Sequence, residues 1–506
     1  MNPLYDTLFG RHSGSNAPFL HLPSGETVTY GSFVERVSQM GGALRGMGLN
    51  PGDRLAAQVE KSPDAVALFG ACAAQGIVLL PLNTAYTPTE LAYFVTDSGA
   101  RMLLTDPEKA DALADVARKA GARLETLGTN GDGTLAEATD AAEPAAPEPR
   151  NAQDLAAFLY TSGTTGRSKG AMLSQENLIS NARVLTDYWR FSDSDTLIHA
   201  LPIFHTHGLF VALNVTLLAG GSMIFLPRFD VDAVLEALPR ATTMMGVPTF
   251  YTRLLADDRF TRDVGGHLRL YTSGSAPMLE ETHHRFEQRI GQRILERYGM
   301  TETSMSTSNP YERERRPGTV GFPLPGVELR ICIPGTEDEV PTGETGMIEV
   351  RGPNVFQGYW QMPEKTAEEL RSNGWFITGD LGVRDADGYV TIVGRDKDLV
   401  ISGGYNIYPR EIEQVIDAQP GVLESAVIGV PHPDMGEGLV AVIVPRPGET
   451  PDDTAIAATV SAELARFKQP RQYVTVPQLP RNTMGKVQKA ELRRVYADTF
   501  VGHIIS

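Results

Sequence analysis

The chain has 506 residues, more than a single hydrophobic core usually organises, so at least two domains are expected. Hydrophobic residues make up 42% and charged residues 21%, which excludes a largely disordered chain. The net charge of −17 argues against a nucleic-acid partner, and two cysteines suit a reducing cytoplasm rather than a disulfide framework.

Short apolar strands alternate with helical patterns in the first part of the chain. Strands are predicted at residues 53–59, 77–80 and 100–104, and this alternation is typical of βαβ units in a largely parallel sheet. The most apolar run, 65–82, is interrupted by Gly, Gln and Pro, so it predicts a buried helix and a strand rather than a membrane span. No secretory or lipidation signal is present, and we expect a soluble protein without a membrane partner.

The character of the sequence changes after residue 127. Residues 128–150 are rich in Ala, Glu, Pro and Gly and predict a surface connection, after which a strand at 155–160 resumes the α/β alternation. Between residues 318 and 393 turn signals separate short strands, which indicates a β-rich subdomain. Beyond Gly394 a helix that starts at Pro409 precedes further strands, enough for a small α+β domain.

A loop of small residues directly after the strand at 155–160 is the strongest local motif. It reads Tyr160-Thr-Ser-Gly-Thr-Thr-Gly-Arg-Ser-Lys-Gly170. Its backbone N–H groups and hydroxyls can surround phosphate oxygens, with Lys169 as a mobile cation. The spacing differs from that of a Walker A motif. Composition alone favours a plain connecting loop, so both interpretations stay open at this point.

This loop resembles the phosphate-binding signature of the adenylate-forming enzymes, which include acyl-CoA synthetases, luciferases and peptide-synthetase adenylation domains. The resemblance spans nearly the whole chain, because the family's other motifs follow in order. They are the adenine and magnesium motif Tyr298-Gly-Met-Thr-Glu-Thr303, the ribose-binding pair Thr378-Gly-Asp380 and Gly394-Arg395, the hinge residue Lys397, the glycine turn Ser402-Gly-Gly404, and the catalytic-lysine motif Arg481-Asn-Thr-Met-Gly-Lys486.

The resemblance implies a ligase that forms an acyl-adenylate from a carboxylate and ATP, and then transfers the acyl group to coenzyme A. ATP, Mg²⁺ and coenzyme A are the implied cofactors and substrates. The implied fold is α/β and acyl-CoA synthetase-like, with α/β subdomains, the β-rich subdomain and a small α+β C-terminal domain. We place the ATP- and acyl-binding domain at residues 1–394, the hinge at 395–398 and the mobile C-terminal domain at 399–506.

The same resemblance assigns roles to single residues. Glu302 is the predicted Mg²⁺ ligand, Thr301 is predicted to lie near the α-phosphate, and Lys486 is predicted to offset negative charge in the adenylation transition state. Taken alone, Lys486 would be interpreted as a solvated lysine in a basic tail, and Glu302 as a capping or solvated carboxylate. The predicted cofactor-binding residues are Thr161, Ser162, Gly163, Thr164, Thr165, Gly166, Lys169, Gly274, Ser275, Ala276, Pro277, Glu296, Tyr298, Gly299, Met300, Asp380, Arg395, Gly403 and Gly404.

A narrower resemblance points to the malonyl-CoA synthetases, including their methylmalonyl-accepting members. It rests on the stretches 202–210, 246–253, 273–277 and 296–302. The substrates of that group carry a second carboxylate, which cannot be buried without a partner and which a guanidinium matches with two parallel hydrogen bonds.

Five residues in these stretches are the predicted substrate contacts. Arg253 and Arg297 are predicted to bind the distal carboxylate, although the pattern alone favours a helix-surface arginine and a structural arginine. His205 is predicted to act at the reacting carboxylate as a catalytic residue, and His207 and Ser273 to line the acyl pocket. The histidine pair lacks a further ligand at metal-binding spacing, so no metal is assigned to it.

Two other functions remain open. Within the same fold, a ligase for a short- or medium-chain or aryl monocarboxylate would be favoured by an apolar residue at either arginine position. In a different class, a nucleotide-binding regulatory protein would have lost the chemistry, which the retained Glu302, Asp380, Arg395 and Lys486 oppose. We expect malonate or methylmalonate, ATP and coenzyme A as small-molecule partners. A lysine acetyltransferase and a deacetylase acting on Lys486 are further predicted partners, because acetylation removes its charge.

Overall fold

The structure is a computed structural model that describes residues 1–161, 168–402, 405–433, 435–482 and 485–500. The chain divides into two compact units. Unit 1 comprises Met1–Glu328 and Val350–Phe376, and unit 2 comprises Leu329–Glu349 and Ile377–Ser506. The predicted α/β class with a smaller α+β C-terminal part is confirmed. The predicted hinge at 395–398 lies inside unit 2, and the domain boundary there stays a prediction.

The first sheet of unit 1 has six strands in the order β6-β5-β3-β4-β7-β8. Its neighbouring strands run parallel except for β7 with β8, as expected for βαβ units. The four strands predicted between residues 53 and 160 are confirmed, with ends that differ by at most two residues. The strands are β3 (Arg54–Gln58), β4 (Val78–Pro81), β5 (Met102–Thr105), β6 (Arg123–Thr126), β7 (Leu155–Thr161) and β8 (Lys169–Ser174).

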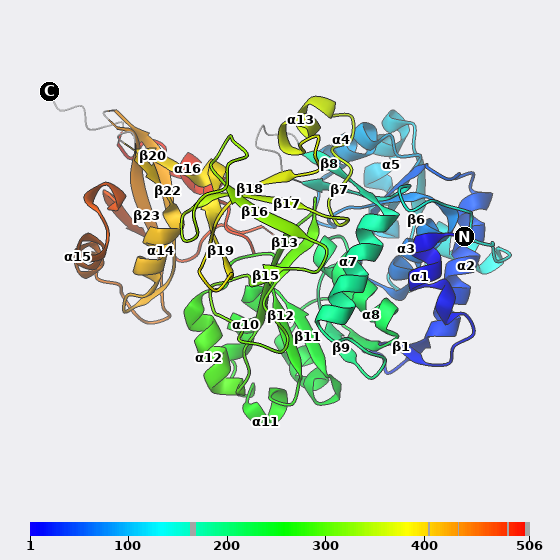
Figure 1. Cartoon of the computed structure of the whole chain (residues 1–506). Helices are drawn as coiled ribbons and strands as arrows, with labels where there is room; N and C mark the ends of the chain where they lie inside the picture. The colour runs from blue at the N-terminus through cyan, green and yellow to red at the C-terminus, as the bar shows by residue number, and fades with distance from the viewer. Residues whose placement is uncertain (162–167, 403–404, 434, 483–484, 501–506) are drawn as a thin grey trace. The chain divides into compact units, whose positions relative to one another are not determined.

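The second sheet of unit 1 has nine strands in the order β15-β14-β13-β12-β11-β9-β10-β1-β2. The strands from β13 to β1 in this order run parallel, and the pairs at both edges are antiparallel. Figure 1 shows β11, β12 and β13 side by side. The strands are β1 (Pro18–His21), β2 (Thr27–Thr29), β9 (Thr196–His199), β10 (Ser222–Phe225), β11 (Thr243–Gly246), β12 (Leu270–Ser273), β13 (Leu295–Met300), β14 (Ser304–Ser308) and β15 (Phe322–Pro323).

Helix α3 (Pro63–Gln75) illustrates how local sequence sets the bounds of a helix. Ser62 caps its start by accepting a hydrogen bond from the backbone N–H of Ala65 (3.1 Å), and Pro63 stands in the first turn, where no N–H partner is needed. Gly76 ends it with a φ of +67°, a conformation that favours glycine. Every residue from Ala65 onward in the helix is buried, which confirms the predicted buried helix. Within the described part of the chain, no helix has the length and apolarity that crossing a membrane requires.

The prediction that residues 128–150 form only a surface connection is wrong. They contain helix α6 (Thr134–Ala141), which packs against α2 (Tyr30–Gly46) and buries Leu135. The backbone N–H of Ala145 donates to the carbonyl of Ser38 in α2 (3.0 Å). The alanine-rich composition suits a helix, but the segment is ordered by contacts with residues about 100 positions away, which local composition does not reveal.

The other helices of unit 1 cover the faces of its sheets. Helices α10, α11 and α12 pack on the nine-stranded sheet around a buried cluster that includes Met244, Tyr271 and Phe286. The helices are α1 (Pro3–Leu8), α4 (Pro88–Ser98), α5 (Ala110–Ala120), α7 (Gln175–Tyr188), α8 (Asn214–Ala219), α9 (Val231–Ala237), α10 (Pro248–Leu255), α11 (Arg262–Gly265), α12 (Glu280–Ile290) and α13 (Pro363–Glu369).

Unit 2 contains most of a sheet in the order β16-β17-β18-β19, and a second sheet in the order β21-β20-β23-β22 with β24 paired to β23. Side chains alternate along β22: Val427 packs with Ile412 of α14, whereas Ala426 and Ile428 pack with Leu492 of α16. The strands are β16 (Glu328–Cys332), β17 (Gly346–Arg351), β18 (Phe376–Arg384), β19 (Val390–Arg395), β20 (Val400–Ser402), β21 (Tyr405–Ile407), β22 (Val422–His432), β23 (Gly436–Pro445) and β24 (Gln472–Thr475). The helices are α14 (Pro409–Asp417), which confirms the predicted start, α15 (Asp453–Glu463) and α16 (Lys489–Val495).

Candidate active site

Four parallel strands of the nine-stranded sheet lead to the predicted substrate residues. They are neighbours in the order β13-β12-β11-β9, and their carboxyl ends lie at one edge of the sheet. His205 follows β9, Arg253 lies on α10 after β11, Gly274 follows β12, and β13 itself carries Arg297. Open α/β sheets bind ligands outside the carboxyl ends of their strands. The fold therefore gathers these segments where a ligand is expected.

Arg297 is a buried cation at this edge. It is 3% exposed, and no hydrogen-bond partner within the described residues meets its Nε or Nη2. Burial lowers the pKa of its guanidinium to about 9, so the group remains charged at neutral pH. Gly274 makes room for it, because a Cβ at that position would come within 2.3 Å of Arg297 Nη1. A buried charge without a carboxylate partner is costly, and its presence here indicates a site for an anion.

Two further buried polar groups at the same edge have open hydrogen-bonding capacity. Ser273 Oγ and His207 Nε2 have no partner in the described part of the chain, and His207 Nδ1 lies 3.4 Å from Ser275 Oγ. Burial, and next the charge of Arg297, lower the pKa of His207 well below its ordinary value and that of His205 to about 4. Both imidazoles are therefore neutral at neutral pH. They can offer hydrogen bonds to a ligand but no positive charge.

The turn after β12 holds an unusual backbone conformation. Ser275 has a φ of +71°, in a region that residues other than glycine, asparagine and aspartate seldom adopt. Ala276 beside it is half-buried and Pro277 is exposed. Such strain persists only where the surroundings enforce it, and it concentrates at ligand sites. The conformation is consistent with the predicted cofactor contact of residues 274–277, which stays a prediction.

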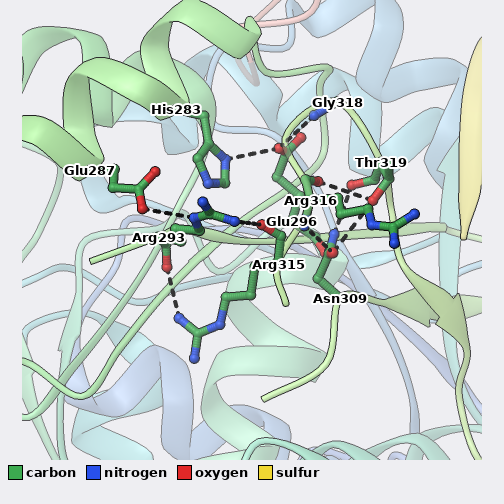
Figure 2. Close-up of polar contacts among 9 residues, drawn as sticks. All are labelled: His283, Glu287, Arg293, Glu296, Asn309, Arg315, Arg316, Gly318 and Thr319. Carbon is green, nitrogen blue, oxygen red and sulfur yellow. Dashed lines mark hydrogen bonds and ion pairs between the residues drawn. The ribbon is translucent and has the colours of Figure 1, made fainter. Parts of the chain in front are cut away.

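Glu296 bonds to several protein groups, and its predicted contact with a cofactor stays a prediction. Its Oε1 lies 3.2 Å from His283 Nδ1 of α12 and accepts a bond from the Gly318 backbone N–H (3.3 Å), as Figure 2 shows. The backbone oxygen of Glu296 accepts bonds from the N–H and the side-chain amide of Asn309. Burial raises the pKa of this carboxyl. These bonds fasten β13, and with it Arg297, to α12 and the following loop.

Arg253 lies on the exposed face of α10. The buried face of that helix carries Tyr251, Leu254 and Leu255. A helix turns about 100° per residue, so Arg253 cannot share the face of those neighbours. The structure therefore separates the two predicted arginines by environment: Arg297 is buried, whereas Arg253 is solvated. The contact of Arg253 with a substrate stays a prediction.

Glu302, the predicted Mg²⁺ ligand, has a buried carboxylate. It is 4% exposed, and its Oε1 accepts bonds from the Tyr359 hydroxyl (3.0 Å) and from Thr161 Oγ1 (3.3 Å). No group of three His, Cys, Asp or Glu among the described residues could hold a metal ion by itself. Mg²⁺ at nucleotide sites takes one or two carboxylates together with phosphate oxygens, so this donor set fits Mg²⁺ with a bound nucleotide.

The remaining predicted cofactor residues of unit 1 flank this carboxylate or lie in the phosphate loop. Tyr298, Gly299, Met300 and Thr301 are half-buried at the end of β13 and just after it. Thr161 ends β7 and Lys169 begins β8, so the described residues border the loop on both sides. Outside the described residues lie Ser162, Gly163, Thr164, Thr165 and Gly166, together with Gly403 and Gly404 of the glycine turn.

Unit 2 gathers four of its predicted site residues. Asp380 of β18 stands opposite Arg395 of β19, and its Oδ1 lies 2.8 Å from Arg395 Nε. Lys397 lies in the 3-10 turn Asp396–Asp398 that follows β19. Loss of water around the ammonium, and next the charge of Arg395, lower the pKa of Lys486 to about 8, although the side chain as a whole is exposed. Asp380, Arg395, Lys397 and Lys486 therefore form one cluster of charges, and their roles as ribose pair, hinge and catalytic lysine stay predictions.

Some residues that contact the predicted site residues, or the backbone beside them, were not predicted from the sequence. Lys61 Nζ donates to His199 Nδ1 and to the His199 carbonyl (both 2.7 Å), and His199 Nε2 donates to the carbonyl of Gly208 (3.0 Å). Gly208 lies in the π-helical segment His207–Leu213, so these bonds fix the backbone beside His207. The only available signal was a lysine three residues after a buried parallel strand. Tyr359, the partner of Glu302, had no signal at all.

Comparisons with known proteins identify the family of this chain. A family model for the AMP-binding enzyme matches residues 11–360, and one for the AMP-binding enzyme C-terminal domain matches residues 411–486. The crystal structure of ATP-bound MatB from Rhodopseudomonas palustris is 55% identical with a TM-score of 0.97, covering 99% of this chain and 100% of that chain.

Curated relatives extend the likeness. Sulfoacetate–CoA ligase from Cupriavidus necator is 36% identical, covering 94% of both chains. Malonate–CoA ligase from Arabidopsis thaliana is 35% identical, covering 89% of this chain and 79% of that protein. Other acyl-CoA-forming enzymes match as well. The chain therefore belongs to the AMP-binding enzyme family of acid–thiol ligases, in the adenylate-forming superfamily that its motifs predicted.

Proposed function

We propose that this protein is an AMP-forming ligase that joins malonate, and also methylmalonate, to coenzyme A at the expense of ATP in the cytoplasm. The substrate is assigned from Arg297, a buried guanidinium whose Nε and Nη2 lack hydrogen-bond partners in the described part of the chain. A second carboxylate on the substrate would pair with it. Relatives named for malonate and for sulfoacetate support an acid with a second anionic group.

The reaction proceeds in two balanced steps. One carboxylate oxygen of malonate attacks the α-phosphorus of ATP, giving malonyl-adenylate and pyrophosphate; the sulfur of coenzyme A then displaces AMP. When bound, Mg²⁺ supplies positive charge beside the phosphates, and Glu302 would hold it. Lys486 provides the cation for the first step, and Asp380 and Arg395 bind the ribose. Neutral His205 and His207 orient the substrate by hydrogen bonds, and Arg297 holds the distal carboxylate.

A panel of carboxylic acids tests the substrate. Coenzyme-A-dependent AMP formation is measured with malonate, methylmalonate, sulfoacetate, succinate, acetate, octanoate and ferulate. We expect kcat/KM for malonate to exceed that for acetate and octanoate by at least about 30-fold, since a buried charge pair contributes about 2 kcal/mol or more. Preference for sulfoacetate would assign the second anionic group to a sulfonate. Preference for octanoate or ferulate would contradict the dicarboxylate assignment.

Lys397 is the proposed hinge about which the residues that follow it reorient between the two steps. Lys397→Pro fixes φ and is expected to slow thiolysis of supplied malonyl-adenylate by about tenfold or more relative to adenylation. The half-reactions are measured as pyrophosphate exchange and as AMP release. Lys397→Ala is the control, because it removes the side chain and leaves the backbone free. A proline variant with both half-reactions intact would place the hinge elsewhere.

Control of the enzyme by modification is proposed at Lys486. Acetylation removes the charge that the adenylation step needs, and the exposed side chain is accessible to an acetyltransferase and a deacetylase.

A further inference from the structure

Lys169, at the end of the phosphate loop, is paired with a carboxylate that no motif identifies. Its Nζ lies 3.0 Å from both carboxylate oxygens of Glu369 and 4.1 Å from the ring centre of Tyr359. Glu369 is the last residue of α13 and stands 200 positions further along the chain. The side chains of Lys169 and Glu369 are only 9% and 21% exposed. The Coulomb attraction between two charges shielded from water in this way is stronger than that between charges on the surface.

Tyr359 connects this ion pair to Glu302. Its hydroxyl lies 2.5 Å from Glu369 Oε2 and 3.0 Å from Glu302 Oε1. A tyrosine hydroxyl has one proton to donate, so the two carboxylates compete for it.

Glu369 keeps its negative charge in this environment. Its Oε1 also lies 2.9 Å from Lys365 Nζ. Burial alone would raise the pKa of Glu369, but the bonds from Tyr359, Lys365 and Lys169 outweigh it and hold the pKa below its ordinary value. The carboxylate is therefore ionised at neutral pH, and it neutralises the cation that the phosphate loop would present to a nucleotide.

We propose that Glu369 is a counter-ion that occupies Lys169 in the nucleotide-free protein and is displaced by the triphosphate of ATP. The inference rests on the ATP-binding part of the proposed function. A triphosphate carries more charge than one carboxylate and competes for the ammonium. When Lys169 turns to the phosphates, Glu369 retains its ion pair with Lys365 and still accepts the hydrogen bond of the Tyr359 hydroxyl.

The test is the affinity for ATP in the presence of Mg²⁺, measured by isothermal titration calorimetry. Glu369→Gln is expected to bind ATP about tenfold more tightly than the wild-type protein, because Lys169 no longer has to leave a charged partner. Glu368→Gln is the matched control: Glu368 is the neighbour on α13, its side chain is 64% exposed, and it pairs with Lys365 at 2.8 Å. We expect the control to change the Kd by less than about twofold.

A double-mutant cycle separates displacement from a general charge effect. In a Lys169→Met background, Glu369→Gln is expected to leave the Kd for ATP unchanged. Equal or weaker ATP binding by Glu369→Gln, or the same tightening in the Lys169→Met background, would overturn the proposal. Thermal unfolding by circular dichroism checks each variant, and Glu369→Met replaces the glutamine variant if that one does not fold. A wild-type protein that binds no ATP would contradict the proposed function itself, so the two failures are distinguishable.

Discussion

Replacement of Arg297 by methionine is expected to lower kcat/KM for malonate by about 30- to 4,000-fold. The range corresponds to about 2–5 kcal/mol for a buried carboxylate that loses its cation, at about 1.4 kcal/mol per factor of ten. Turnover of butyrate, which has no distal charge, is expected to fall much less. The measurement is CoA-dependent AMP formation with both acids. A lysine in place of Arg297 should restore only part of the activity, because an ammonium cannot make two parallel bonds.

Stability provides an independent readout of the same residue. Without a ligand, the buried guanidinium of Arg297 has no carboxylate partner among the described residues, so its removal is expected to raise the melting temperature of the ligand-free protein. Arg253→Ala is the control for stability: its side chain is exposed, so we expect no gain in stability, whereas a loss on malonate would support its predicted contact with the distal carboxylate. Equal losses on malonate and butyrate in Arg297→Met would make Arg297 a structural residue and contradict the dicarboxylate assignment.

Replacement of Lys486 by alanine is expected to suppress adenylation by about 100-fold or more, the scale of losing one preorganised charge in the transition state. Thiolysis of supplied malonyl-adenylate is expected to survive, because that step takes place at the acyl carbon and forms no five-coordinate phosphorus for Lys486 to stabilise. The two half-reactions are measured separately, by pyrophosphate exchange and by AMP release from the adenylate. Lys489→Ala is the control, since Lys489 pairs with Glu413 in the same unit.

The pH dependence of adenylation tests whether the Lys486 ammonium is the group that acts in this step. A pKa of about 8 means that Lys486 is charged below that pH and loses its charge above it. We therefore expect kcat/KM for ATP in adenylation to fall as the pH rises through about 8, because this parameter reports the free enzyme. The falling limb should be absent from the residual activity of Lys486→Ala. Equal damage to both half-reactions, or an unchanged pH limb in the variant, would contradict this role of Lys486.

Local patterns were sufficient for the strands and for the segments that follow them. The strands β3, β4, β5 and β7 are short apolar runs bounded by polar or turn residues. Runs of this length and composition indicate buried strands. The motifs at 298–303 and 378–380 were identified by their resemblance to those of the adenylate-forming enzymes and by their order along the chain. Helix α6 was missed because its apolar face is short and depends on α2 for burial.

The environments of the site residues were decided by tertiary structure. The sequence does not distinguish the environments of Arg253 and Arg297. In the structure, Arg253 lies on the exposed face of α10, whereas Arg297 lies on the inner strand β13 and is buried next to Gly274. The carboxylate of Glu296 likewise contacts His283, a partner that the sequence did not indicate. Which side chain is buried depends on the elements that pack over it, and that information is not local.

The sequence by itself determined the α/β class and the order of the motifs, because alternating strands and helices and each motif are made of residues that are close along the chain; the chemistry followed from the resemblance of those motifs to a known family. Only the tertiary structure decided the partners of the charged groups: Glu369 for Lys169, Tyr359 for Glu302 and His199 for Lys61. Each pair joins residues that are more than 50 positions apart. The free energy of a charge depends on its burial and on its nearest counter-charge, and both are set by contacts that only the folded chain makes.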